Sequence, residues 1–345
     1  MRVSFLAVNK NPKFFRKDPS YIYRCESVGL ALSDLGVNTT FHHLKQHSLA
    51  TFSELVVFHR PRFSIRLLLT IYWLQFQGCR VIADFDDLVF DKSYSEWSPG
   101  VVNGVLSTAK TQKNFHSHYK ALQYFDLVTV STVPLQEHIH RLYPGKRVVV
   151  LPNTIHTSWR RQFDHIPIAD TNFERPIITY LPGTRSHDRD FHVFAVGLSK
   201  FLNDHPHVSL QVTGPLKFDL PVRSEQVIHH EKVPFARYHE QIKTAWVNLA
   251  PLEITPFTRC KSALKVIEAS YWGRPTLCSL IPDAERLIGC GAIPVDSDED
   301  LYSKLVELLD PVSYQKTVSN LRNRIVALSD VSKSADFLSQ LVTID

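Results

Sequence analysis

Two lysines and a glutamate recur at helical spacing in the last third of the sequence. The pattern of residues 261–271 predicts a helix, and Lys261, Lys265 and Glu268 are four and three residues apart on it. All three side chains would therefore project from one side of that helix. Two ammonium groups followed one turn later by a carboxylate suit a ligand with phosphates at one end and hydroxyls at the other, such as a nucleotide diphosphate sugar. The alternative is an ordinary amphipathic helix with a solvated Lys–Glu pair.

The stretch around this helix resembles the nucleotide-binding segment of GT-B glycosyltransferases of the retaining, family-4 kind, a group that includes enzymes of bacterial surface polysaccharide synthesis. The likeness lies in PLE, PFTRCKSALKVIEAS and GRPTLCS, between residues 251 and 279. It implies that Glu268 holds the ribose hydroxyls and that Ser262 belongs to the donor-binding segment. Cys260 stands where these enzymes often carry a second glutamate, and Glu253 in the preceding loop is the candidate to replace that carboxylate.

A loop at the start of the second half offers further contacts to phosphate. Gly183, Thr184 and Arg185 follow an apolar run at 177–181 and precede a helical pattern at 190–202. A loop of this kind points backbone N–H groups and the positive end of a helix at an anion, and an arginine adds a bidentate phosphate donor. The corresponding loop of GT-B enzymes resembles this one in its place, its glycine and its basic residue. The alternative is a surface turn.

Three carboxylates directly follow an apolar run in the first half. Asp84, Asp86 and Asp87 come after the run at 80–83, which places them at the carboxyl end of an expected strand. Close like charges raise one another's pKa, so one of these groups is a candidate general base toward an acceptor hydroxyl. The alternatives are a structural network that caps loops, a phosphatase of the haloacid dehalogenase type, and the metal-binding DxD of GT-A glycosyltransferases.

A histidine follows the neighbouring apolar run in the same way. His59 comes after residues 55–58 and therefore belongs to the same edge of the expected sheet. The resemblance implies a role close to the donor sugar, because retaining GT-B enzymes often place a histidine of the first domain there. The candidate catalytic residues are thus His59, the three aspartates and Glu253.

Apolar runs and helical patterns alternate along both halves of the chain. Strands are expected at 3–8, 38–42, 55–58, 80–83, 126–130 and 147–151 in the first half, and at 177–181, 208–213, 227–229, 247–250 and 276–279 in the second. This alternation predicts an α/β protein with two Rossmann-like, doubly wound domains that face each other across a cleft, which is the GT-B architecture.

Breaks in the alternation give the expected domain boundaries. We expect an acceptor-side domain at 1–155, a linker at 156–175 where the periodicity fails, a nucleotide-sugar-binding domain at 176–312 and a helical tail at 313–345. The tail is long enough to pack back on the first domain.

The composition argues against several classes of protein. Hydrophobic residues make up 44% and charged residues 21% of the 345 residues, which is typical of a globular chain, and the net charge of +5 does not require nucleic acid as a partner. The five cysteines show no CxxC spacing and the paired histidines are one or two residues apart, so we expect no metal site. Scattered cysteines, with no apolar run of about 18 residues, favour a cytoplasmic protein.

Residues 63–76 are apolar almost all round a helix, and Arg60, Arg62 and Arg66 lie beside or within them. We interpret this stretch as a helix buried against the first sheet. The alternative is a peripheral contact at the inner face of a membrane that carries a lipid-linked acceptor.

Together these features predict a metal-independent glycosyltransferase of polysaccharide biosynthesis that uses no cofactor. It would move a sugar, with retention, from a nucleotide-sugar donor on the second domain to a glycan or lipid-linked glycan on the first. The main alternative is a non-catalytic GT-B subunit for binding or scaffolding, which Cys260 favours and the retained Lys261, Lys265 and Glu268 oppose. A phosphatase built on the three aspartates is the third possibility.

Overall fold

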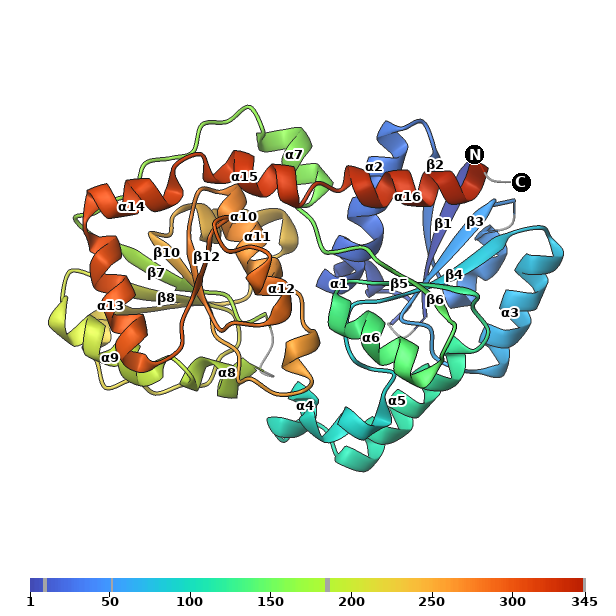
Figure 1. Ribbon diagram of the computed structural model, residues 1–345, viewed down its shortest axis with the longest axis horizontal. Helices are drawn as coiled ribbons and strands as arrows, with labels where there is room; N and C mark the ends of the chain where they lie inside the picture. The colour runs from blue at the N-terminus through green and yellow to red at the C-terminus, as the bar shows by residue number, and fades with distance from the viewer. Residues whose placement is uncertain (9–10, 51, 184–186, 344–345) are drawn as a thin grey trace.

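Two parallel sheets organise the chain, one in each half (Figure 1). The computed structural model describes residues 1–8, 11–50, 52–183 and 187–343. The first sheet has the strand order β2-β1-β3-β4-β5-β6 and the second the order β12-β11-β10-β7-β8-β9, and all neighbouring strands are parallel. This is the α/β architecture of two Rossmann-like domains that the alternation predicts.

The strands are short, mostly buried apolar runs. Those of the first sheet are β1 (Arg2–Ala7), β2 (Asn38–His43), β3 (Leu55–His59), β4 (Arg80–Phe85), β5 (Leu127–Val130) and β6 (Arg147–Val150). Those of the second are β7 (Ile177–Tyr180), β8 (Ser209–Thr213), β9 (Val227–His230), β10 (Val247–Ala250), β11 (Thr276–Cys278) and β12 (Ala292–Pro294). The sequence pattern missed β12, because three residues that end in a proline give no periodic signal.

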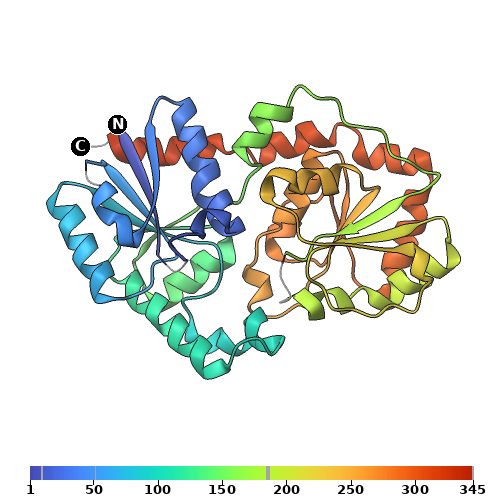
Figure 2. The same cartoon turned by 180° about the vertical axis from the view of Figure 1, so that it is seen from behind.

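Helices connect the strands and cover the sheets (Figures 1 and 2). The first domain contains α1 (Pro19–Tyr21), α2 (Ser27–Asp34), α3 (Ile65–Phe76), α4 (Pro99–Val102), α5 (Thr108–Leu122) and α6 (Val133–Leu142). The second contains α8 (Asp188–His192), α9 (Ala195–Asp204), α10 (Phe235–Lys243), α11 (Leu264–Tyr271), α12 (Pro282–Glu285), α13 (Asp298–Leu309), α14 (Pro311–Val318) and α15 (Leu321–Leu328). Ser64, Ser107 and Ser297 cap α3, α5 and α13 by accepting a backbone N–H.

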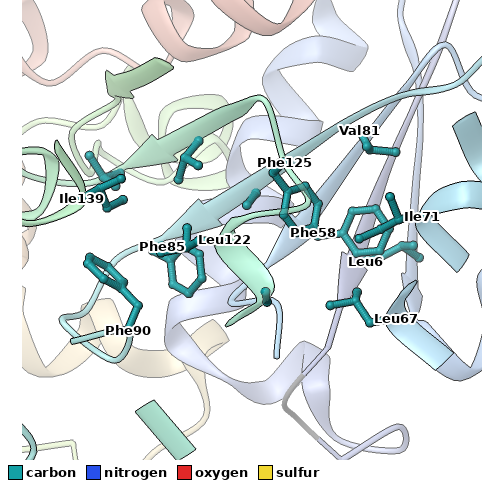
Figure 3. Close-up of a cluster of buried hydrophobic side chains, with 14 of the residues drawn as sticks. Leu6, Phe58, Leu67, Ile71, Val81, Phe85, Phe90, Leu122, Phe125 and Ile139 are labelled. Atoms are coloured by element: carbon teal, nitrogen blue, oxygen red, sulfur yellow. The ribbon is translucent and has the colours of Figure 1, made fainter. Parts of the chain in front are cut away.

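The first sheet carries apolar clusters on both faces. Figure 3 shows the cluster between the sheet and α3, α5 and α6, in which Phe58 and Phe85 of the sheet meet Leu67 and Ile71 of α3 and Leu122 of α5. A second cluster lies on the opposite face beneath α2. Because helices cover both faces, the inner strands β1, β3, β4 and β5 are almost fully buried, which is why they are mostly continuous apolar runs rather than alternating ones.

The last helix, α16 (Ser332–Thr343), returns to the first domain. Ala335, Leu338 and Leu341 pack in the same cluster as Val3 and Phe5 of β1. Figures 1 and 2 show α16 beside α2, whereas α13 to α15 cover the second domain. The chain therefore passes between the domains twice, once before β7 and once before α16.

The segment at 156–175 contains the helix α7 (Thr157–Phe163) and packs on both domains. The hydroxyl of Thr157 donates to the carbonyl of Ser27 in the first domain (2.6 Å). The ring of Trp159 stacks on that of Tyr271 in the second domain, with 6.1 Å between ring centroids. This segment is thus fixed against the two halves that it joins.

The helix α3 covers the first sheet with only one of its faces. Leu67, Ile71 and Leu74 are buried, but Leu69 and Phe76 on the opposite face are 64% and 86% exposed. The interpretation of this stretch as a buried helix is right for the inner face and wrong for the outer one, because no further layer of the described chain covers α3. No helix among the described residues is both long enough and apolar enough to cross a membrane.

Candidate active site

Residues that follow the strands of the two sheets meet between the domains. Thr132, just after β5, donates from Oγ1 to the carbonyl oxygen of Cys260 (2.9 Å). Nζ of Lys261, in the loop after β10, lies 3.8 Å from Oδ1 of Asp87, which follows β4. Because the strands of a parallel sheet end at a common edge, these contacts place the carboxyl edges of the two sheets opposite each other, where ligands of such folds bind.

Glu268 is a buried carboxyl group that hydroxyls from both domains hold. It lies on α11 with 5% of its surface exposed, and it accepts hydrogen bonds from the phenols of Tyr23 in the first domain and Tyr238 in the second. Burial raises its pKa to about 7, although both hydrogen bonds and the ammonium group of Lys265 pull the pKa downward. This carboxyl group therefore changes its charge near neutral pH.

Lys261 does not lie on the helix that we expected. α11 begins three residues later, and Lys261 has extended dihedral angles (φ −71°, ψ 154°) directly after the short 3₁₀ helix η7 (Thr258–Cys260). The carboxylate of Asp283 accepts the backbone N–H of Ala263 at 2.7 Å, which holds this segment as a loop. The predicted helix start is therefore wrong, and only the other two members of the trio share a helix face.

Lys261 and Lys265 still lie close enough to His187 for both to lower its pKa. Burial lowers the pKa of His187, its hydrogen bond to Asp190 opposes this shift, and the ammonium groups of Lys265 and Lys261 lower the pKa further. Lys265 is itself half-buried, and burial lowers the pKa of its ammonium group while Glu268 opposes the change. Two ammonium groups at this edge of the sheet favour an anionic ligand.

Three buried polar atoms in this region have no hydrogen-bond partner among the described residues. They are Oγ of Ser262, the hydroxyl of Tyr180 and Nε2 of His156. Tyr180 is the last residue of β7, and the ring of His156 is 5.6 Å from that of Tyr23. Buried polar groups in folded proteins are almost always paired, so these atoms are candidates for a hydrogen bond to a ligand or to water. Ser262 is a residue that the resemblance implied for donor binding.

The glycine of the predicted phosphate loop has a left-handed backbone. Gly183 has φ +74°, and a Cβ atom there would meet nothing within 4 Å, so backbone conformation and not space requires glycine. Thr184 and Arg185 lie outside the described residues. The helical pattern at 190–202 forms two helices, α8 and α9, with a break at Val193 and Phe194. The five-residue α8 is too short for a substantial helix dipole.

Glu253 and Cys260 have different surroundings. Oε1 of Glu253 accepts from Nη2 of Arg189 (2.6 Å), and the backbone N–H of Glu253 donates to Asp190 (3.0 Å). Cys260 is 2% exposed and packs among apolar residues of the first domain, and burial raises the pKa of its thiol to about 12. The thiol therefore stays neutral and cannot act as a carboxylate, and Glu253 already has a cationic partner.

Arginines face the aspartates of the first domain. Asp84, within β4, accepts from Nη2 and Nε of Arg24 (2.5 and 3.1 Å), while Arg60 donates from Nε to Asp86 and from Nη2 to Asp87 (both 2.6 Å). Burial opposes ionisation of Asp84 and Asp86, but the arginines hold both pKa values below the usual range. The expected rise in pKa is therefore wrong for these two carboxylates, because cations, not only like charges, surround them.

His59 is enclosed by the same network. It is fully buried, with Nδ1 3.4 Å from Oδ2 of Asp84 and Nε2 2.9 Å from Oγ of Ser20, which in turn donates to Oδ2 of Asp86 (2.5 Å). Both ring nitrogens are therefore engaged, and a direct contact with a sugar requires Ser20 to move. No cluster of three His, Cys, Asp or Glu side chains suited to a metal ion occurs in the described part of the chain.

Sequence reasoning missed three residues that hold the carboxylates of Glu268 and Asp84. Tyr23 and Arg24 lie on a π-helix, Ile22–Glu26, between α1 and α2. Such irregular turns often occur at functional sites, but they leave no recognisable signal in a sequence. Tyr238 on α10 was missed as well, because a lone aromatic residue on an amphipathic helix cannot be told from a core residue.

Solved structures share this fold, although no family model and no curated protein sequence matches the chain. The structure of TarM is similar with a TM-score of 0.57 and 10% identity, over 84% of this chain and 55% of that chain. The pneumococcal O-GlcNAc transferase GtfA, in complex with UDP and GlcNAc, is similar with a TM-score of 0.55 and 11% identity, over 87% of this chain and 58% of that one. The UDP-GlcNAc 2-epimerase from Methanocaldococcus jannaschii is similar with a TM-score of 0.53 and 10% identity, over 99% of this chain and 100% of that one.

This chain therefore spans less than two thirds of TarM and GtfA, but the whole length of the epimerase. At such low sequence identities the likeness shows the fold alone, a GT-B fold of two Rossmann-like domains.

Proposed function

We propose that this protein is a glycosyltransferase that binds a nucleotide-sugar donor between its two domains. The observation that carries the proposal is the carboxyl group of Glu268 at the carboxyl edge of the second sheet. This group is buried, accepts hydrogen bonds from two phenols and has a pKa of about 7. Burying an ionisable group opposes folding, and Glu268 has no ion pair within 4 Å among the described residues, so its presence at a ligand-binding edge favours a role in binding.

In this proposal the donor replaces contacts that now join the domains. The ribose hydroxyls donate to Glu268 in place of Tyr23, whose phenol holds that carboxyl group from the other domain. The diphosphate draws Lys261 away from Asp87, because phosphate and carboxylate compete for the same ammonium group, and Lys265 adds a second positive charge. These fixed charges then stabilise the departing diphosphate.

Further residues complete the donor side of the proposed site. The hydroxyl of Ser262 and the phenol of Tyr180, which have no partner among the described residues, are free to bond to the donor. Gly183 gives the loop before α8 the left-handed turn that lets backbone approach phosphate. Thr184 and Arg185, beyond the described residues, complete that loop in the proposal. The scheme uses no cofactor and no metal ion.

The acceptor is proposed to bind on the first domain beside Asp87, with transfer by retention to a glycan or lipid-linked glycan in cytoplasmic polysaccharide synthesis. Asp84 and Asp86 remain anionic and, with His59, keep Arg24 and Arg60 in place. We propose UDP as the carrier of the donor sugar, since GtfA, which has the same fold, was solved with UDP and GlcNAc.

Thermal stabilisation by nucleotides tests the proposal. UDP, GDP, CMP, ADP and dTDP are added to the wild type, to Glu268→Ala and to the control Glu307→Ala, an exposed glutamate of α13. A ligand at 100 times its dissociation constant stabilises the folded state by about 2.7 kcal/mol. We expect UDP to stabilise the wild type and the control, and Glu268→Ala to lose most of that effect. If no nucleotide stabilises the wild type at millimolar concentration, the non-catalytic scaffold becomes the better interpretation.

A UDP-sugar 2-epimerase is the second candidate. The observation in its favour is that the epimerase from M. jannaschii matches over 99% of this chain and 100% of its own. NMR of UDP-GlcNAc incubated with the protein separates the two activities. Inversion at C2 of a sugar that stays attached to UDP supports the epimerase, whereas release of UDP that rises when glycan acceptors are added supports the transferase.

A further inference from the structure

The outer face of α3 is an exposed apolar stripe. Ile65, Leu69, Tyr72 and Phe76 are 74%, 64%, 57% and 86% exposed. Their spacing of four, three and four residues places them in one row along the helix. Single exposed apolar residues are common on protein surfaces, but a continuous row opposite an already buried face indicates a surface that another partner covers.

The segment that packs beside α3 carries further exposed apolar residues. The 3₁₀ helix η3 (Leu44–Ala50) contacts α3 through the ring of His47, which lies 5.5 Å from the ring of Trp73. Leu49 is 56% exposed and Phe52, just after η3, is 81% exposed with a left-handed φ of 68°. We call the α3 surface the set formed by Ile65, Leu69, Tyr72, Phe76, Leu49 and Phe52.

The exposed charged residues near the α3 surface in the sequence are positive except for Glu54. Lys45, Arg62 and Arg66 are exposed, and no aspartate or glutamate occurs between Glu54 and Asp84 in the sequence. The first 150 residues contain 18 lysines and arginines against 11 aspartates and glutamates, although the whole chain has a net charge of only +5. An apolar stripe with a cationic border matches the boundary between the acyl chains and the head groups of an anionic lipid layer.

We propose that the α3 surface docks on an anionic lipid bilayer, with α3 lying in the plane of the interface. The 12 residues of α3 extend only about 18 Å, which is too short to cross the hydrocarbon core but suits a helix that lies flat. A second copy of the chain fits less well, because both copies would bring the cationic side chains of Lys45, Arg62 and Arg66 into one interface. An acidic protein partner remains an outcome of the test.

The proposal goes beyond the glycosyltransferase function and does not depend on the nucleotide site. It does connect with that site through the chain, because residues 60–64 alone separate His59, at the end of β3, from the start of α3. A bilayer held against α3 would therefore lie close to the acceptor side of the first domain.

Binding of the full-length protein to vesicles tests the proposal. The vesicles contain phosphatidylcholine alone or phosphatidylcholine with phosphatidylglycerol, and bound protein is measured by co-sedimentation. The variants Leu69→Glu and Phe76→Glu change exposed residues, so folding is retained, and Val196→Glu on α9, where Val196 is 69% exposed, is the matched control in the second domain. The UDP-induced thermal shift of each variant shows whether the nucleotide site is intact.

We expect the wild type and Val196→Glu to bind the anionic vesicles, more weakly at high salt, and each α3 variant to bind about tenfold less. The proposal is overturned if the wild type does not bind anionic vesicles, or if Leu69→Glu binds them as well as the wild type does. It is also overturned if the wild type does not bind vesicles but forms a dimer that Leu69→Glu separates. Binding of an acidic protein instead of lipid to this surface would overturn it as well.

Discussion

Replacing Glu268 by glutamine should stabilise the protein and at the same time weaken its binding of nucleotide. The carboxyl group of Glu268 has a pKa of about 7 in the folded protein and about 4.5 in the unfolded chain. Between these values the folded state holds a proton that the unfolded state has lost. The free energy of unfolding therefore falls as the pH rises from about 4.5 to about 7, and it levels off above that range.

The size of this effect follows from the pKa. Ionising a carboxyl group whose pKa moves from 4.5 to about 7 lowers the stability by about 3 kcal/mol. Glutamine resembles the protonated acid and carries no charge to desolvate. Its carbonyl oxygen can accept from one of the two phenols, Tyr23 or Tyr238, and its amide N–H can donate to the oxygen of the other. The stability gained by Glu268→Gln should thus be small at pH 5 and about 3 kcal/mol at pH 8, which corresponds to about 4 °C in melting temperature for a chain of this length.

Calorimetry of the ligand-free proteins at pH 5 and pH 8 measures the difference. The control is Glu307→Gln, the same change at an exposed position of α13, for which the shift should be small at both pH values. Isothermal titration with UDP at pH 8 should show weaker binding by Glu268→Gln. A stability difference that is the same at pH 5 and pH 8, or a variant that melts below the wild type at pH 8, would refute the reasoning.

Three further changes probe other contacts. Asp87→Asn removes the carboxylate that competes for Lys261, so we expect UDP to bind about two- to fivefold more tightly in titration calorimetry; unchanged or weaker binding would contradict the proposed competition. Arg24→Met leaves the carboxylate of Asp84 buried without its ion pair and should lower stability by about 3–5 kcal/mol in urea unfolding, with partial recovery when Asp84→Asn is added; no recovery would mean that lost packing, not charge, is responsible. Gly197→Ala would place a Cβ atom 2.4 Å from a backbone carbonyl of α13, so we expect a loss of about 1–3 kcal/mol, and an unchanged melting temperature would show that α9 and α13 can separate freely.

Local sequence patterns predict most of the fold but only part of the site. The alternation of apolar runs with helical patterns predicts every strand of the two sheets except β12, because a fully buried strand must be a continuous apolar run. The sequence also points to Glu268 and Lys265, since a spacing of three residues on a helix is a local property. Lys261 was placed on that helix in error, because the carboxylate that holds its loop, Asp283, comes 20 residues after Ala263.

Partners from distant segments explain what the sequence could not show. Tyr23 and Glu268 are 245 residues apart, and no pattern within either segment indicates that they meet. For the aspartates, the sequence predicted an interaction that does not dominate. Their closeness in sequence suggested mutual repulsion and a raised pKa, whereas Arg24, 60 residues away from Asp84, lowers the pKa of Asp84. Predictions of pKa shifts from sequence thus fail wherever the opposite charge belongs to a residue that is distant in the sequence and close only in the folded protein.

The return of α16 to the first domain has a consequence for synthesis of the chain. β1 leaves the ribosome long before the helix that covers one face of its sheet with Leu338 and Leu341. At about 5–20 residues per second, the roughly 190 residues between β6 and the end of α16 take about 10–40 s to translate. During that time the second domain can complete its core, while the nascent first domain still exposes the apolar surface around Val3 and Phe5. Exposed apolar surface of this kind is prone to aggregation until α16 has been made, and a chain that stops before α16 keeps it exposed.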